Sequence, residues 1–269
     1  MSRDGSPLGY VVALFDVMGF ESRLEKYGLD EIYSRYMKIV QYIKRNDERN
    51  HVLYDMLNFN GPMWTAEGNV ICAYDIRAAY ASDSILIWAN LAWRMVQDKS
   101  FEVLKKNSTH PAWGHLSFPV PLRPFFETCA EIICLGIECD LPLRGAVSMG
   151  DAILNEKERI FLGSPLVEAA RLENKQNCIS LSLCNSFKMQ QDTINCLLPY
   201  TSHLKNDVAD SLVYKYAFNW PDYWMATRNE KDIKTIIQQM AENNNQHEYY
   251  INTLKLIEFS VEEKKRSVR

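Results

Sequence analysis

Two aspartates interrupt apolar segments and could act together. Asp16 follows the six apolar residues 10–15, and Asp83 lies in a short polar turn before the apolar segment 85–88. If these segments are neighbouring strands, both carboxylates reach one edge of the sheet. Two adjacent carboxylates repel each other unless a cation lies between them, and such oxygen ligands suit Mg²⁺ or Mn²⁺. Each Asp could instead serve only to make a turn, a common role for this residue.

The segment after Asp16 is a candidate phosphate-binding turn. Val17, Met18, Gly19 and Phe20 lead directly into a stretch with helical spacing of apolar residues. The first N–H groups of a helix lack intrahelical partners and lie at the positive end of its dipole, so they attract phosphate. We therefore expect free backbone N–H groups facing the cation site. The alternative is that Gly19 only permits the turn.

Arg171 is a third candidate. It lies on a helix that the Gly163-Ser164-Pro165 sequence should open, with Ser164 as the cap and Pro165 in the first turn. A guanidinium on this helix could brace a phosphate through paired donors. It could also be a solvated charge beside Glu168 and Glu173.

The elements that must position these residues are expected in the order strand, helix, hairpin, helix, strand, strand, helix, strand. The order predicts an α+β sandwich, with helices on one face of a mainly antiparallel sheet. Small residues in the strand 143–150 indicate a close approach by a neighbour. The expected strands are 10–15, 70–80, 85–89, 143–150, 160–162, 178–183 and 212–218. The expected helices are 21–45, 122–135, 166–174, 231–242 and 247–262. Segment 46–68 is expected to be a loop or short helical insertion, and segment 99–121 a surface loop.

The composition excludes several classes of protein. The chain has 269 residues, of which 47% are apolar and 24% charged, as in a globular protein with a core. Its net charge of −4 gives no general attraction for nucleic acid or anionic lipid. Seven cysteines without a C-x-x-C spacing, and five histidines without H-E-x-x-H, give little support for zinc. No apolar run suits export or a membrane span, so we expect a cytoplasmic protein.

Four short motifs, in order, resemble those of the class III nucleotide cyclases. They correspond to the F-x-D-x-x-G-F opening strand, shortened by one residue before Asp16, to the Gly-Asp hairpin, to the R-x-G-I-H-x-G strand and to the G-x-x-V-N-x-A-x-R helix. The matching segments are 15–20, 82–84, 144–150 and 163–171. The resemblance covers roughly residues 10–183. It implies a ferredoxin-like palm fold, with a leader at 1–9, a catalytic domain at 10–220 and a C-terminal helical extension at 221–269 packed on the same domain.

The departures from these motifs concern the base and the ribose. Val167 replaces the Asn of the helix, Ala79 replaces the purine-reading Lys, and Ile160 replaces its partner acid. A site without placed donors and acceptors discriminates adenine poorly. Tyr80, next to the Lys position, would narrow the pocket for a smaller base, although it could equally be a core residue of a strand. The combination resembles the Pycsar pyrimidine cyclases of bacterial antiphage defence, which make cyclic UMP or cyclic CMP to activate an effector protein.

The resemblance implies a head-to-tail homodimer with two shared active sites. Asp16 and Asp83 of one subunit would hold two divalent cations, Mg²⁺ or Mn²⁺, with the Val17 carbonyl as a further ligand. Arg171 of the other subunit would stabilise charge on the α-phosphate. By position only, Ser148 and Ser164 are candidates to replace the missing Asn. The expected substrate is UTP, slightly favoured over CTP.

Other functions stay open from the sequence. One is an adenylyl or guanylyl cyclase with a divergent base pocket. Another is a catalytically silent module of the cyclase fold that binds nucleotide or a partner; Val167 favours it, whereas Asp16, Asp83 and Arg171 argue against it. A diguanylate-synthesising relative lacks its G-G-[DE]-E-F motif, and a nucleic-acid-binding protein lacks a basic stripe.

Overall fold

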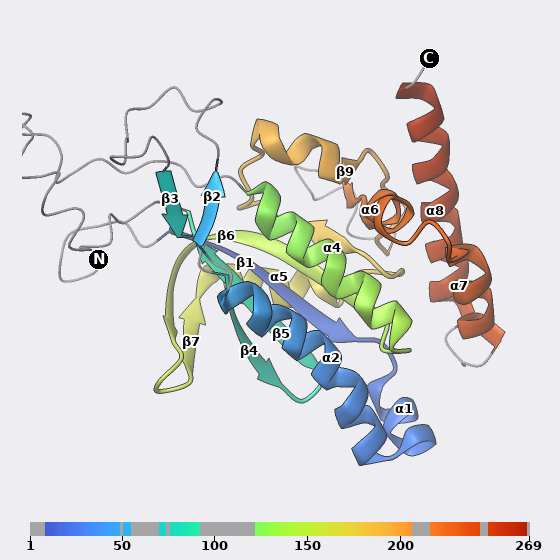
Figure 1. The fold of residues 1–269 in the computed structure, drawn as a ribbon, viewed down its shortest axis with the longest axis horizontal. Coiled ribbons are helices and arrows are strands. Elements are labelled where there is room, and N and C mark those ends of the chain that lie inside the picture. The colour runs from blue at the N-terminus through green and yellow to red at the C-terminus, as the bar shows by residue number, and fades with distance from the viewer. Residues whose placement is uncertain are drawn as a thin grey trace, which may run out of the picture.

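The computed structural model describes residues 9–48, 51–54, 70–73, 76–91, 122–205, 216–242 and 247–267. Its main feature is a mostly antiparallel eight-stranded sheet with the order β4-β5-β1-β6-β8-β10-β9, in which β7 pairs with β6 (Figure 1). A separate two-stranded sheet joins β2 and β3. The strands are β1 (Gly9–Val17), β2 (His51–Tyr54), β3 (Val70–Ala73), β4 (Arg77–Ala81), β5 (Ser84–Asn90), β6 (Leu143–Asn155), β7 (Ile160–Gly163), β8 (Leu181–Leu183), β9 (Leu197–Leu198) and β10 (Ala217–Phe218).

The strand β1 lies at the centre of the sheet, antiparallel to β5 on one side and to β6 on the other. Val12, Ala13 and Phe15 are fully buried, as expected for an apolar strand covered on both faces. The close approach indicated by the small residues of β6 occurs at Gly145. A Cβ atom at that position would lie 2.3 Å from the carbonyl oxygen of Leu14, so only glycine fits there.

Helices cover both faces of the sheet. Figure 1 shows α2 (Leu29–Glu48) and α4 (Arg123–Glu138) in front of the sheet, where Ile39 and Phe126 share the main core with Phe15. The helix α5 (Ser164–Glu173) packs on the opposite face, where Ala169 contacts a smaller cluster that contains Ala146. The α+β class is confirmed, but the expectation that all helices lie on one face is wrong. Successive side chains of β1 and β6 point to opposite faces of the sheet, and apolar side chains lie on both. Each face must therefore be packed against other elements.

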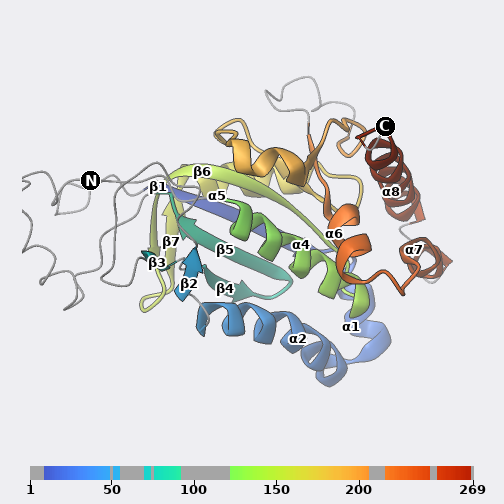
Figure 2. The same cartoon turned by 45° about the horizontal axis from the view of Figure 1, so that its top comes forward.

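The C-terminal region continues the main core. It consists of α6 (Trp220–Thr227), α7 (Ile233–Glu242) and α8 (His247–Ser267), which lie together beyond one side of the sheet (Figure 2). Trp220, Ile237 and Tyr250 are buried in the same cluster as Phe15 and Ile87 of the sheet. The extension therefore shares one core with residues 10–220. None of the described helices is long and apolar enough to cross a membrane.

Several expected elements differ in their bounds. The helix expected at 21–45 is divided into α1 (Phe20–Tyr27) and α2, because Gly28 has a positive φ of 77°, which favours glycine and ends α1. The strand expected at 70–80 forms β3 and β4, which belong to different sheets. The strand expected at 178–183 is reduced to β8, and β6 continues beyond 150 to Asn155.

Other elements were not predicted, and some predictions cannot be compared. The strand β2 lies in the segment expected to be irregular at 46–68, and the 3-10 helix η2 (Gln191–Cys196), β9 and α6 were missed. Short elements of this kind carry too few residues to show a period. The loop expected at 99–121 and residues 212–215 of the expected strand 212–218 lie outside the described residues.

The buried His203 should make the protein sensitive to acid. Burial lowers the pKa of this imidazole from 6.5 to about 4, and the backbone of Tyr200 offsets the effect only in part. The folded state thus binds this proton less readily than the unfolded state does, so stability is full above pH 6.5 and falls as the pH drops towards 4. We expect urea unfolding to show a loss of about 2 kcal/mol between pH 7 and pH 5 from this group.

The substitution His203→Gln should flatten that pH dependence, because glutamine does not titrate. His247→Gln, at the first residue of α8, carries the same chemical change and is the matched control. An equal pH slope in the wild type and in His203→Gln would contradict the prediction.

Candidate active site

The structure brings Asp16 and Asp83 together. Asp16 lies near the end of β1 and pairs with Ser84 of β5, so the turn of the β4–β5 hairpin lies beside it. The N–H of Val17 donates to the carbonyl oxygen of Asp83 at 3.0 Å. The two carboxyl groups are close enough that both the charge of Asp83 and a hydrogen bond to it raise the pKa of Asp16, in addition to the larger effect of burial. The neighbouring strands β1 and β5 thus place both acids at the same end of the sheet, where β1 ends and β5 begins.

Arg144 and Glu173 join this pair, and the sequence had not indicated either role. Arg144 of β6 is the direct cross-strand partner of Asp16. Its guanidinium lies 3.3 Å from Asp16 Oδ2 and 2.6 Å from Glu173 Oε1, on α5. The side chains of Asp16 and Arg144 are 22% and 17% exposed, and that of Glu173 is 7% exposed. Knowledge of the strand order would have revealed Arg144, because residues opposite each other in an antiparallel pair share a face.

Asp16, Asp83, Arg144 and Glu173 together form an acidic cluster, which has more acidic groups than basic ones. Burial raises the pKa of Glu173 to about 7; the Arg144 charge opposes this, and the charges of Asp16 and Asp83 add to it. The pKa of Asp16 is likewise raised by burial and by Asp83, against the attraction of Arg144. Asp16 and Glu173 share the single guanidinium of Arg144, and Asp83 adds a third carboxyl group beside Asp16, so up to two negative charges have no positive partner among these residues. Such a cluster takes up either protons or cations.

The donor set fits a magnesium-type cation that is shared with a substrate. Mg²⁺ is commonly held by one or two carboxylates together with substrate phosphates and water, rather than by a cage of protein ligands. Asp16 and Asp83 supply two carboxylates, and the carbonyl of Val17 follows Asp16 directly. Within the described ranges, no group of three His, Cys, Asp or Glu side chains is arranged to hold a metal. The two carboxylates and this carbonyl are the kinds of oxygen ligand that suit an ion arriving with phosphate.

The turn after β1 has the expected form but fewer free donors than expected. Gly19 has a φ of 65°, in the left-handed region that favours glycine, and α1 begins at Phe20. The N–H of Val17 is bound to Asp83, and the N–H of Met18 donates to the carbonyl of Pro142 at 2.9 Å. The expectation that these two N–H groups face a ligand is therefore wrong. The donors left for a phosphate are those that open the helix, from Gly19 and Phe20 onwards.

Tyr80 lies on the other face of the sheet from Asp16. It pairs with Ile85, which in turn pairs with Phe15, so these three side chains share the face covered by α2. Its ring packs edge-on against Tyr36 of α2, with 6.3 Å between the ring centres. The expectation that Tyr80 narrows a base pocket beside Asp16 is therefore wrong. Ala79, one residue earlier, is on the Asp16 face, because side chains alternate along a strand.

Arg171 lies on the solvent side of α5. It is exposed and makes no hydrogen bond or ion pair with the part of the chain that the structure describes. Val167 lies one turn earlier on the same helix face and is 50% exposed, which is unusual for a large apolar residue. Arg171 and Val167 therefore form a surface that the described part of the chain does not cover.

The two serines proposed for the role of the missing Asn differ in position. Ser148 is fully buried, and its hydroxyl donates to the carbonyl of Pro165 at 2.6 Å, which fixes the start of α5. It is thus unavailable to a ribose. Ser164 is exposed and is the first residue of α5. It was expected to be the N-cap, but Gly163 occupies that position, and no side chain makes a capping hydrogen bond.

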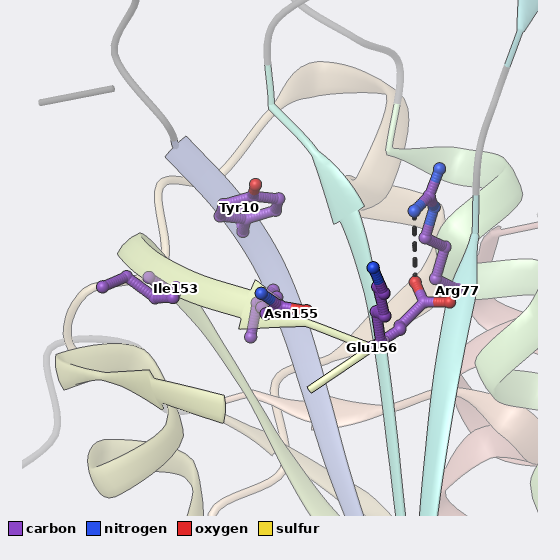
Figure 3. A pocket seen from close by; sticks show the side chains of 8 residues that line it. Tyr10, Arg77, Ile153, Asn155 and Glu156 are labelled. Atoms are coloured by element: carbon purple, nitrogen blue, oxygen red, sulfur yellow. Dashed lines mark hydrogen bonds and ion pairs between the residues drawn. The ribbon is translucent and has the colours of Figure 1, made fainter. Parts of the chain in front are cut away.

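A cavity of about 720 Å³ lies elsewhere, at the other end of β1 (Figure 3). It is lined by Tyr10, by the ion pair between Arg77 and Glu156 at 3.2 Å, and by residues of the β6–β7 hairpin. Tyr10 precedes Asp16 by six residues of extended chain, which is roughly 20 Å. The cavity and the acidic cluster are therefore separate places on the molecule.

Comparisons with known proteins do not assign this site. No family model, no curated protein and no solved structure matches the chain.

Proposed function

We propose that this protein is a nucleotide cyclase that converts UTP or CTP into the 3′,5′-cyclic nucleotide and pyrophosphate. The observation that carries the proposal is the acidic cluster. Asp16 and Asp83 share one sheet edge, directly before a glycine turn that opens a helix. A carboxylate pair beside free helix N–H groups is suited to a triphosphate accompanied by divalent cations.

The topology supports the class III cyclase palm. In chain order, β1, α2, the β4–β5 hairpin, α4 and β6 form a strand–helix–hairpin–helix–strand unit. In space the strands follow the order β4-β5-β1-β6. Apart from α1 and the β2–β3 pair, which lie between these elements in the chain, this order matches the split β-α-β-β-α-β arrangement of ferredoxin-like domains, and the match supports the proposal. In class III cyclases, β1 and the hairpin supply the two metal-binding acids; in this chain Asp16 lies near the end of β1 and Asp83 lies in the turn of the β4–β5 hairpin.

The residues of the cluster have separate roles in this reaction. Asp16 and Asp83, with the Val17 carbonyl, would hold the cations. Divalent cations bound there would lower the pKa of the ribose 3′-hydroxyl and neutralise the triphosphate. The 3′-hydroxyl would lose its proton to solvent water, its oxygen would form a bond to the α-phosphorus, the bond from the α-phosphorus to the bridging oxygen would break, and pyrophosphate would leave. Arg144 holds Asp16 in position through its ion pairs with Asp16 and Glu173.

The uncovered surface of α5 supports a homodimer with shared sites. Arg171 and Val167 are exposed together, and Ile153 and Leu162, a cross-strand pair on the adjoining β6–β7 hairpin, are each 59% exposed. Exposed apolar residues concentrated in one region are typical of protein interfaces. In the dimer, the partner's Arg171 would stabilise the charge that develops on the α-phosphate.

The preference for a pyrimidine now rests on two positions. Ala79, on the Asp16 face, offers no polar group at the place of the purine-reading Lys, and Ile160 offers none at the place of its partner acid. A site without these polar groups cannot form the hydrogen bonds that would recognise the edge of a purine base. Tyr80 does not line this site, because its ring packs against Tyr36 of α2.

A catalytically silent nucleotide-binding module is the second candidate. The ion pair between Arg144 and Asp16 favours it, since a cation must compete with this guanidinium for one Asp16 oxygen. The absence of the ribose-orienting Asn at Val167 favours it too. If the protein is an active cyclase, its resemblance to the Pycsar cyclases suggests a cytoplasmic protein of antiphage defence, whose cyclic product acts on a separate effector.

Incubation with each of the four nucleoside triphosphates and Mn²⁺, followed by mass analysis, tests the proposal. Cyclic UMP or cyclic CMP as the main product supports it. Cyclic AMP or cyclic GMP would establish a purine cyclase, and nucleotide binding without any product would establish the silent module.

A further inference from the structure

A buried arginine links the C-terminal helix to the turn that follows Asp16. Arg23 of α1 is only 2% exposed. Its guanidinium donates to the Met18 carbonyl at 2.5 Å, to the Tyr250 hydroxyl of α8 at 2.8 Å and to the Asp140 carbonyl at 2.7 Å. It also reaches the Gly19 carbonyl at 3.5 Å and an Asp140 carboxylate oxygen at 3.4 Å. Five hydrogen bonds match the five N–H donors of the group.

The contact with Met18 fixes the orientation of one peptide unit. The N–H of Met18 is already held by the Pro142 carbonyl, and its carbonyl is held by Arg23. In a trans peptide, the carbonyl and the following N–H point in opposite directions. With the Met18 carbonyl directed inwards at Arg23, the N–H of Gly19 must point the other way, out of the core. This N–H is one of the donors left for a phosphate.

The other side of the guanidinium is held equally firmly. Tyr250 is fully buried, and Asp140, which accepts from Arg23, also accepts from the Tyr27 hydroxyl at 2.6 Å. Asp140 adopts a left-handed conformation with φ of 52°, which is uncommon for a residue other than glycine. The α4–β6 connection, through Asp140, and α8, through Tyr250, thus fix the position of Arg23, which in turn binds the turn after β1.

We propose that Arg23 is a positioning residue, anchored by Tyr250, that aims the Gly19 N–H at the phosphates of the nucleotide, so that α8 controls phosphate binding. The inference rests on the proposed function for the identity of the ligand. It goes beyond that function because it gives the C-terminal helix a part in the site, about 230 residues away in the sequence.

The test uses inorganic tripolyphosphate with Mg²⁺ as the probe, in calorimetry on the full chain. Arg23→Lys cannot hold three segments with a single ammonium group, and we expect its affinity for tripolyphosphate to fall about 10-fold. Tyr250→Phe, which removes one hydrogen bond and keeps the ring, should lower it about 3-fold. Tyr249→Phe, at the partly buried neighbouring position, should leave it unchanged. The affinity for Mn²⁺ alone, measured by electron paramagnetic resonance, should stay the same in all three.

A direct readout comes from the amide of Gly19. With selective ¹⁵N-glycine labelling, only the 11 glycines give signals, and the Gly19 signal should shift on addition of tripolyphosphate in the wild type and much less in Tyr250→Phe. Affinities and shifts equal to those of the wild type, with only a lower melting temperature, would overturn the inference and leave the cyclase proposal intact. The opposite result, with the expected shifts but no cyclic product, would overturn the cyclase and leave the positioning role.

Discussion

Replacing Asp83 with Asn is expected to lower the rate of cyclic-nucleotide formation by roughly 100-fold or more, with little change in folding. The side chain keeps its size but loses the charge that a divalent cation requires. The Val17 N–H bond to the Asp83 carbonyl is made by the backbone and survives the substitution. Burial is the main cause of the raised pKa of Asp16, and the substitution removes the smaller contribution that the charge of Asp83 adds to it. Product formation with UTP and Mn²⁺, beside a melting curve, measures both effects.

Asp151→Asn is the matched control for this substitution. Asp151 is an exposed acid that pairs with Gly9, at the far end of the same sheet. It removes the same charge without touching the acidic cluster, so its activity should equal that of the wild type. Asp16→Asn should be as inactive as Asp83→Asn. An active Asp83→Asn enzyme would show that the two aspartates do not hold the catalytic cations.

Mixing two inactive variants is expected to restore activity if the sites are shared. Asp16→Ala and Arg171→Ala should each be inactive as homodimers. In a mixed dimer, one site takes its Asp16 from one subunit and its Arg171 from the other, so it is complete, whereas the second site lacks both. Random exchange makes half of the dimers mixed, and a quarter of all sites should then function. The measurement is cyclic-nucleotide formation after subunit exchange.

A second mixture supplies the control. Asp16 and Asp83 belong to the same subunit of a site, because the β1–β5 pairing joins them within one chain. A mixture of Asp16→Ala with Asp83→Ala therefore leaves every site without one acid and should stay inactive. If the mixture with Arg171→Ala shows no more activity than this control, Arg171 does not act across a dimer.

The sequence alone determined the local parts of the candidate site. The apolar run before Asp16 predicted a buried strand, and the short polar segment before Ile85 predicted a hairpin that contains Asp83. Both are present as β1 and the β4–β5 hairpin. The glycine turn after Asp16 and the helix that carries Arg171 were also visible. These features depend on residues that are close in the chain, so propensity and period are enough to reveal them.

The tertiary structure decided what surrounds those parts. The β1–β6 register places Arg144 opposite Asp16, and the packing of α5 brings Glu173 to the same guanidinium. The alternation of side chains along β4 turns Tyr80 away from Asp16 towards α2. Such relations depend on which strand lies beside which and in what register. A one-residue change in register reverses every face, and no local pattern in the sequence records that choice.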